Sequence, residues 1–126
     1  MPKILIVDDE AGVRNTIDAM LSLDGHAVIH AEDGVQALES IKRHLPDVVI
    51  CDIEMPRLKG YGVLAEMREN PVLSKIPIIF LTGKTDISYL VKAMQLNVND
   101  FLTKPFTHDD LVGAIDVQLK KFNTKI

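Results

Sequence analysis

The chain has 126 residues and a formal net charge of −4, with 47% hydrophobic and 25% charged residues. Length and composition are those of a single globular domain with one core. The acidic balance, without any run of Lys or Arg, argues against direct nucleic-acid binding, because a phosphate backbone requires a basic surface. No apolar stretch approaches the roughly 18 residues that a membrane-spanning helix needs, so no membrane partner is expected.

The N-terminus and the single cysteine indicate the compartment. Residues 1–4 lead directly into an apolar run, without the charged region and cleavage site of a secretory signal. Cys51 is the only cysteine, so no disulfide forms within the chain and oxidising surroundings are not required. We expect a cytoplasmic protein in which residues 1–122 form the domain. Residues 123–126 are expected to be a C-terminal tail or the start of a linker.

Apolar runs alternate five times with segments of helical periodicity, a pattern typical of parallel strands joined by crossover helices. The predicted strands are Lys3 to Val7, His26 to His30, Asp47 to Cys51, Ile76 to Leu81 and Asp100 to Thr103. The first, third and fourth are near-continuous runs of Ile, Val and Leu. These three should be the central strands, because a strand covered on both faces is apolar throughout.

Apolar residues at spacings of three and four predict an amphipathic helix after each strand. Their positions are Val13, Ile17, Met20 and Leu21; Leu38 and Ile41; Leu64 and Met67; Ile87, Leu90, Val91 and Met94; and Leu111, Ile115, Leu119 and Phe122, with polar Gln118 among the last set. Helix ends are indicated by Gly25, Asp33-Gly34 and Thr107 with the acidic pair 109–110. Five such units predict an α/β fold: a single-domain, doubly wound, five-stranded parallel sheet with the flavodoxin-like strand order 2-1-3-4-5.

Polar side chains gather at the carboxyl ends of the predicted strands, where ligands bind in such folds. Asp8 and Asp9 follow the first strand, and Asp52, Thr82 and Lys104 follow the third, fourth and fifth. Close carboxylates repel one another by roughly 4 kcal/mol per pair at an effective dielectric of about 20, so a divalent cation is expected among them. All-oxygen ligands favour Mg²⁺, with Mn²⁺ as an alternative.

A carboxylate kept ionised by a metal, beside an ammonium and a hydroxyl group, is equipped to capture a phosphoryl group. The metal and Lys104 would offset charge on the phosphoryl oxygens while a carboxylate oxygen attacks phosphorus, which gives an acyl phosphate. Little other catalytic machinery is required.

Four motifs give the chain a specific resemblance to a known family. They are Val7-Asp8-Asp9-Glu10, Cys51-Asp52-Ile53-Glu54-Met55-Pro56, Leu81-Thr82-Gly83 and Thr103-Lys104-Pro105-Phe106. In order and spacing the chain resembles the CheY-like receiver domain of bacterial response regulators, from Lys3 to about Phe122. The resemblance implies a phosphorylation switch of two-component signalling rather than a metabolic enzyme. Such a switch takes a phosphoryl group from a histidine kinase or phosphotransfer protein and slowly hydrolyses its own acyl phosphate.

The resemblance also implies roles for individual residues. It assigns Asp52 as the phosphoacceptor. It implies that the metal is bound by Asp9 directly, by Asp8 through water, by Asp52, and by the backbone carbonyl of Glu54. It also implies that Thr82 and Lys104 contact the phosphoryl group, that Phe101 turns inward on activation, and that the peptide bond before Pro105 is cis. Phe101 replaces a tyrosine that is frequent in the family and has no hydroxyl group, so the switch is expected to be less sharply defined.

Three further residues bear on the lifetime of the acyl phosphate. Glu54 and Lys84 each lie two residues beyond a site residue, and an ion pair between them would limit water access at the mouth of the crevice. The alternative is an exposed pair worth less than about 1 kcal/mol. Gly83 either keeps the crevice open to a phosphodonor or is an ordinary turn glycine.

Two alternative functions stay open at the level of sequence. A metal-dependent phosphatase could use the same aspartate as its nucleophile, although the chain has no spare length for a substrate cap. A flavodoxin-like binding domain would need a hydroxyl- and glycine-rich loop where residues 8–10 are acidic. The output protein or domain is unspecified. The family's usual contact face combines the fourth helix, the fifth strand and the fifth helix, and here carries Tyr89, Lys92, Gln95 and Lys120. We expect a monomer or weak dimer.

Overall fold

The computed structural model describes residues 2–53, 60–83, 91, 94–95 and 97–123. Its elements, in chain order, are β1 (Lys3–Val7), α1 (Ala11–Leu23), β2 (Ala27–Ala31), α2 (Gly34–His44), β3 (Val48–Asp52), α3 (Gly60–Glu69), the short 3-10 helix η1 (Leu73–Lys75), β4 (Ile78–Thr82), β5 (Asp100–Thr103) and α5 (His108–Asn123). The strands pair in parallel in the order β2-β1-β3-β4-β5. The predicted fold class and strand order are therefore confirmed.

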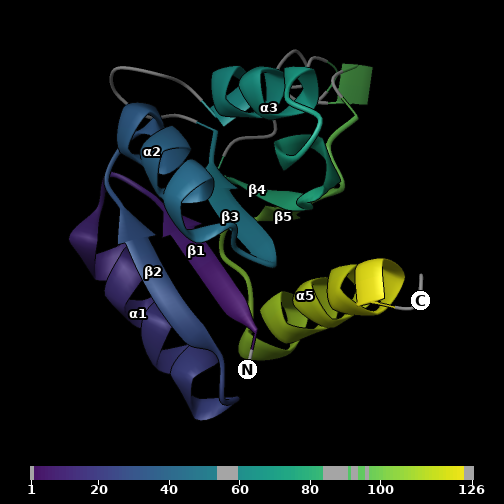
Figure 1. Cartoon of the computed structure of the whole chain (residues 1–126). Coiled ribbons are helices and arrows are strands. Elements are labelled where there is room, and N and C mark those ends of the chain that lie inside the picture. The colour runs from purple at the N-terminus through teal and green to yellow at the C-terminus, as the bar shows by residue number, and fades with distance from the viewer. Residues whose placement is uncertain (1, 54–59, 84–90, 92–93, 96, 124–126) are drawn as a thin grey trace.

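The sheet is the middle layer of three, with α1 and α5 on one face and α2 and α3 on the other (Figure 1). Successive strand residues point to opposite faces, so each strand contributes to two cores. Leu5 and Val7 of β1 pack with the α2 and α3 side. Ile4 and Ile6 pack with the α1 and α5 side. This double burial requires the unbroken apolar runs of the central strands.

The burial of the strands confirms which of them are central. Every residue of β3 and β4 is buried, and so is β1 after Lys3. The edge strands β2 and β5 are only partly buried. Since β3 runs to Asp52, one residue further than predicted, this aspartate is held in the sheet beside Leu81.

Helix ends agree with the local chemistry of the sequence. Asp33 accepts a hydrogen bond from the Gln36 N–H at 2.8 Å and caps α2. Gly25, with φ of +83°, follows the C-cap of α1 in the left-handed conformation that glycine adopts at little cost. Thr107 and Asp110 exchange hydrogen bonds at 3.0 Å at the start of α5. All three predicted helix ends are confirmed.

The predicted helix around residues 87–94 falls mostly outside the described residues, so this part of the expected contact face is not placed. None of the helices within the described ranges is long and apolar enough to cross a membrane.

Candidate functional site

The parallel register brings the predicted residues to one edge of the sheet. Asp8 directly follows β1, and its N–H donates to the Ala31 carbonyl at the end of β2. Asp52 and Thr82 end β3 and β4, and Lys104 follows β5, with its N–H donating to the Thr82 carbonyl at 2.7 Å. Residues almost a hundred positions apart in the sequence therefore share one crevice.

The side chain of Lys104 joins two of the aspartates. Its Nζ lies 3.3 Å from Asp8 Oδ2 and 3.6 Å from Asp52 Oδ2. Asp8 is fully buried and Asp52 is 7% exposed, so both carboxylates need such a cation. Burial alone would lower the pKa of Lys104, but the negative charges of Asp52 and Asp8 outweigh it and raise the pKa above its ordinary value. Lys104 is therefore a protonated partner of both carboxylates.

A compact carboxylate cluster lies at the end of β1. Oxygen atoms of Asp8, Asp9 and Glu10 come within 4.8 Å of one another. Asp8 is buried whereas Asp9 and Glu10 are exposed, so a cation could enter from solvent. The all-oxygen donor set and the open side fit Mg²⁺, which keeps several water ligands. Lys104 Nζ contacts both Asp8 of this cluster and Asp52.

Glu10 is a member of the cluster that the sequence-based assignment of site residues left out. Its N–H donates to Asp8 Oδ1 at 2.9 Å, a local turn that folds the residue back beside the aspartates. The sequence contains one indication that Glu10 belongs to the cluster: it is the third acidic residue in a row, after Asp8 and Asp9.

Arg14 is a second residue that sequence reasoning missed. It is only 9% exposed on α1, and its Nη1 donates to the Asp8 carbonyl at 2.6 Å. Its Nη2 also lies 3.8 Å from Glu32. The spacing of Arg14, Ile17 and Leu21 already placed a charged residue on the apolar stripe of this helix.

Gly60 lies against the backbone of Asp52. Its N–H donates to the Ile53 carbonyl at 2.9 Å. A Cβ at this position would come within 2.7 Å of the Asp52 carbonyl oxygen and 2.9 Å of the Ile53 Cα. Only glycine allows this approach, so α3 begins directly beside the last residue of β3.

The remaining predicted residues are placed as follows. Phe101 is partly buried and packs against the core on the α2 and α3 side. Gly83 is exposed, and a Cβ there would meet only Lys104 Cδ, at 3.9 Å. The Lys104–Pro105 peptide bond is cis, the isomer implied by the resemblance. Glu54 and Lys84 lie outside the described residues, so their expected ion pair stays a prediction.

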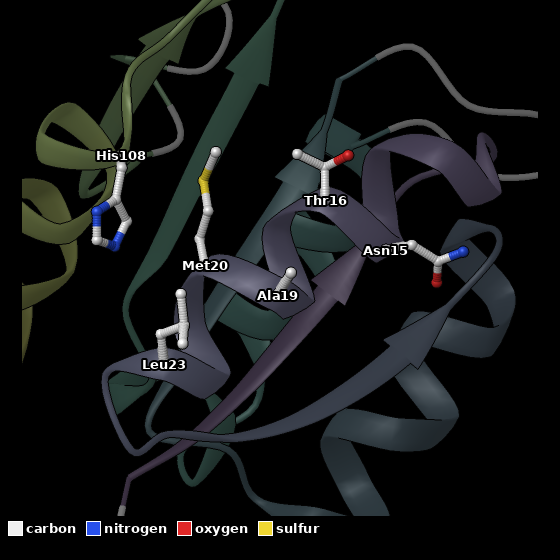
Figure 2. A pocket seen from close by; sticks show the side chains of 6 residues that line it. All are labelled: Asn15, Thr16, Ala19, Met20, Leu23 and His108. Carbon is white, nitrogen blue, oxygen red and sulfur yellow. The ribbon is translucent and has the colours of Figure 1, made fainter.

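An apolar hollow lies beside the crevice, between α1 and the start of α5. Figure 2 shows the six residues that line it: Asn15, Thr16, Ala19, Met20, Leu23 and His108. A second hollow shares Thr16 and Met20 with it and continues to Glu10 and Lys104. We call the two together the α1 groove. Leu23, which lines the groove, is 85% exposed.

Comparison with known proteins agrees with this geometry. The chain matches the family model described as response regulator receiver domain over residues 4–116. It is 41% identical over 121 residues to the "Probable transcriptional regulator ycf27" of Guillardia theta, covering 96% of this chain and 46% of that protein. The chain thus spans about half the length of the curated relatives it matches.

Solved receiver domains superpose closely on the whole fold. The signal receiver domain of a signal transduction histidine kinase from Syntrophus aciditrophicus has a TM-score of 0.93 at 27% identity, covering 100% of this chain and 96% of that one. The receiver domain of a sensor histidine kinase from Pseudomonas aeruginosa has a TM-score of 0.87 at 31% identity, covering 94% and 97%, and has a magnesium ion coordinated in its active site cleft. With the sheet order, the acidic crevice and the match over residues 4–116 in agreement, this chain belongs to the response regulator receiver domain family of two-component systems.

Proposed function

We propose that the chain is a phosphorylation switch in which Asp52 accepts a phosphoryl group with the help of Mg²⁺ bound at the acidic cluster. The observation that carries this proposal is the position of Lys104, within 3.6 Å of Asp52 and 3.3 Å of buried Asp8. It places an ammonium group between the candidate nucleophile and the candidate metal site. Receiver domains are signalling switches rather than metabolic enzymes, and this arrangement suits a single phosphoryl transfer.

The proposed reaction uses few groups. An Asp52 carboxylate oxygen attacks the phosphorus atom while the bond from phosphorus to the donor breaks, and the donor leaves with that bonding pair. Lys104 Nζ donates to a phosphoryl oxygen and offsets its negative charge. When bound, Mg²⁺ would supply further positive charge to the phosphoryl group. Asp9 and Asp8 would hold the ion, with Asp52 and the Glu54 backbone carbonyl completing the expected ligands.

The signal would leave the site through Thr82 and Phe101. Thr82 ends β4 beside Lys104, and Phe101 lies on the neighbouring strand β5. A hydrogen bond from Thr82 to the phosphoryl group would favour one of two packings of Phe101, a population shift of the kind that ligands produce in two-state proteins. Gly83, Glu54 and Lys84 would set access of water to the acyl phosphate.

The phosphodonor is proposed to be a histidine kinase or phosphotransfer protein. The α1 groove reaches Glu10 and Lys104 at one end and exposes Leu23 at the other. An apolar side chain of a protein donor could pack there while its phosphorylated residue lies over the crevice. The output protein or domain and the pathway stay unassigned.

Intact mass after incubation with acetyl phosphate tests the proposal. We expect a single phosphoryl-sized increase that requires Mg²⁺ in the wild type. Asp52→Asn should show no increase, because an amide oxygen is a much weaker nucleophile than a carboxylate. Thr103→Val, an exposed position on the same edge, is the matched control and should still be labelled.

Three other outcomes of these experiments would contradict the proposal or favour an alternative function. Labelling of Asp52→Asn to the wild-type level would reject Asp52 as the acceptor. Repeated turnover of phosphate esters, with release of inorganic phosphate in excess of protein, would favour the phosphatase alternative. No labelling of the wild type, together with no binding of beryllofluoride, would favour a module that acts by binding alone.

A further inference from the structure

The strand-to-helix turn that carries the carboxylate cluster lacks an ordinary helix cap. Glu10 is the N-cap residue of α1 but makes no side-chain cap hydrogen bond, and the first turn of this helix has no acidic residue. The turn must nevertheless hold Asp8, Asp9 and Glu10 with their oxygens close together. The Glu10 N–H bond to Asp8 Oδ1 restrains the turn from within, but the carbonyl of buried Asp8 still needs a hydrogen-bond donor.

Arg14 meets this requirement. Its Nη1 donates to the Asp8 carbonyl at 2.6 Å, and the arginine side chain is only 11% exposed. A charged donor in a poorly hydrated position makes a stronger hydrogen bond than a neutral one. By comparison, the contact to Glu32 is longer, at 3.8 Å, and the Glu32 side chain is 66% exposed, so it contributes little.

The bond acts on the residue that is central to the cluster. Asp8 Oδ1 receives the Glu10 N–H and Oδ2 lies beside Lys104, so the backbone of Asp8 determines where three charged groups lie. Rotation of its peptide group would move both carboxylate oxygens and the exposed Asp9 next to it. Groups that orient ligands in this way typically change metal affinity 10- to 100-fold when they are removed.

We propose that Arg14 is a positioning residue for the divalent cation: it anchors the Asp8 carbonyl and so presents the Asp8 and Asp9 carboxylates in the geometry that binds Mg²⁺. The inference rests on the proposed function for the identity of the ion. Arg14 itself contacts neither the ion nor the phosphoryl group.

Direct binding of Mn²⁺, followed by electron paramagnetic resonance and competed with MgCl₂, tests this role without any phosphorylation. Arg14→Met removes the charge and the donors and keeps much of the stem. We expect its Kd for Mn²⁺ to rise by about tenfold or more. Arg14→Lys keeps a cationic donor and should recover most of the affinity. Glu32→Gln is the matched control and should change the Kd by less than about twofold, because it loses only the exposed contact.

Circular dichroism and the Tm without metal separate this role from a general loss of structure. If Arg14→Met does not fold, Arg14→Gln replaces it in the same comparison. A folded variant that binds Mn²⁺ as tightly as the wild type overturns the proposal. A weakened variant that Arg14→Lys does not rescue also overturns it, since the donor would then not be the cause.

The same measurements distinguish failure of the role proposed for Arg14 from failure of the proposed function. If the wild type binds no Mn²⁺ or Mg²⁺, the metal-dependent switch itself is rejected. If the wild type binds the ions and becomes phosphorylated while Arg14→Met retains full affinity, only the role of Arg14 is rejected.

Discussion

Lys104 is the residue on which the charge balance of the crevice depends. It lies 3.3 Å from the fully buried Asp8 carboxylate and remains 25% exposed along its side chain. In the absence of a metal ion this ammonium offsets the charge of Asp8 and Asp52. A bound divalent cation would share that task, so Lys104 would become available to a phosphoryl oxygen.

Replacing Lys104 by methionine tests this charge balance. The buried Asp8 carboxylate loses its cationic partner, and we expect the free energy of unfolding to fall by about 1–3 kcal/mol, less than for a fully buried pair because Lys104 is partly exposed. This change in the free energy of unfolding is measured by urea unfolding at neutral pH without divalent ions. Saturating MgCl₂ should recover part of the loss. Lys75→Met, an exposed lysine at the end of η1, is the control and should have little effect.

The difference in stability between the wild type and Lys104→Met should depend on pH, and the raised pKa of Lys104 gives the sign of that dependence. The pKa of Lys104 in the folded protein is raised above its ordinary value of 10.5. Because the folded-state pKa exceeds the unfolded one, the stabilisation is fully present below pH 10.5 and is lost as pH rises through the raised pKa. The stability difference between wild type and Lys104→Met should therefore shrink only in strongly alkaline solution. A difference that vanished near neutral pH would contradict this charge assignment.

At the scale of elements, the junction between β3 and α3 determines how the candidate phosphoacceptor is held. The backbone of Asp52 pairs with Leu81 of β4, and its carbonyl is closely approached by Gly60, the first residue of α3. Close packing of this kind transmits small shifts, because buried backbone cannot be displaced independently of its neighbours.

Gly60→Ala tests the importance of this approach. The added methyl group would lie 2.7 Å from the Asp52 carbonyl oxygen, so the strand or the helix must move. We expect a loss of about 1–3 kcal/mol in stability, the usual cost of overpacking, and slower labelling of Asp52 by acetyl phosphate. Gly113→Ala in α5 is the matched control, because its Cβ has no neighbour within 4 Å among the described residues. It should stabilise the helix by about 0.5–1 kcal/mol. Equal stability of the two variants would show that the close approach has no cost.

At the scale of the whole molecule, the crevice and the α1 groove form one continuous surface. Thr16 and Met20 line both hollows, and the second hollow ends at Glu10 and Lys104. A protein donor that packs in the groove would thus be guided to the reacting groups, whereas a small-molecule donor needs only the crevice. The two kinds of donor should respond differently to a change in the groove.

The substitution Leu23→Asp tests whether protein donors and small-molecule donors differ in this way. Leu23 is 85% exposed, so the substitution should leave the fold intact, but it places a charge in the apolar groove. We expect transfer from a histidine kinase or phosphotransfer domain that phosphorylates the wild type to slow by about tenfold, the effect of roughly 1.4 kcal/mol at an interface. Labelling by acetyl phosphate should be unchanged. Val72→Asp, a 61% exposed apolar residue beside η1, is the control. Equal slowing with both donors would place the effect in the crevice rather than in docking.

The sequence by itself determined the layers, the strand order and the edge of the sheet at which the site lies. Unbroken apolar runs are needed wherever a strand is covered on both faces, and parallel strands bring all their carboxyl ends to one edge. Asp8, Asp52, Thr82 and Lys104 could therefore be predicted as neighbours. Their roles in phosphoryl transfer came from the resemblance to a family and remain proposals.

Only the tertiary structure decided the contacts that hold these groups. The bond from Arg14 to the Asp8 carbonyl, the approach of Gly60 to Asp52, and the place of Lys104 between two aspartates depend on strand register and helix rotation to within an ångström or so. Periodicity indicates which face of an element is buried. It does not specify which atom on that face a neighbouring element reaches, because that depends on how all the elements pack together.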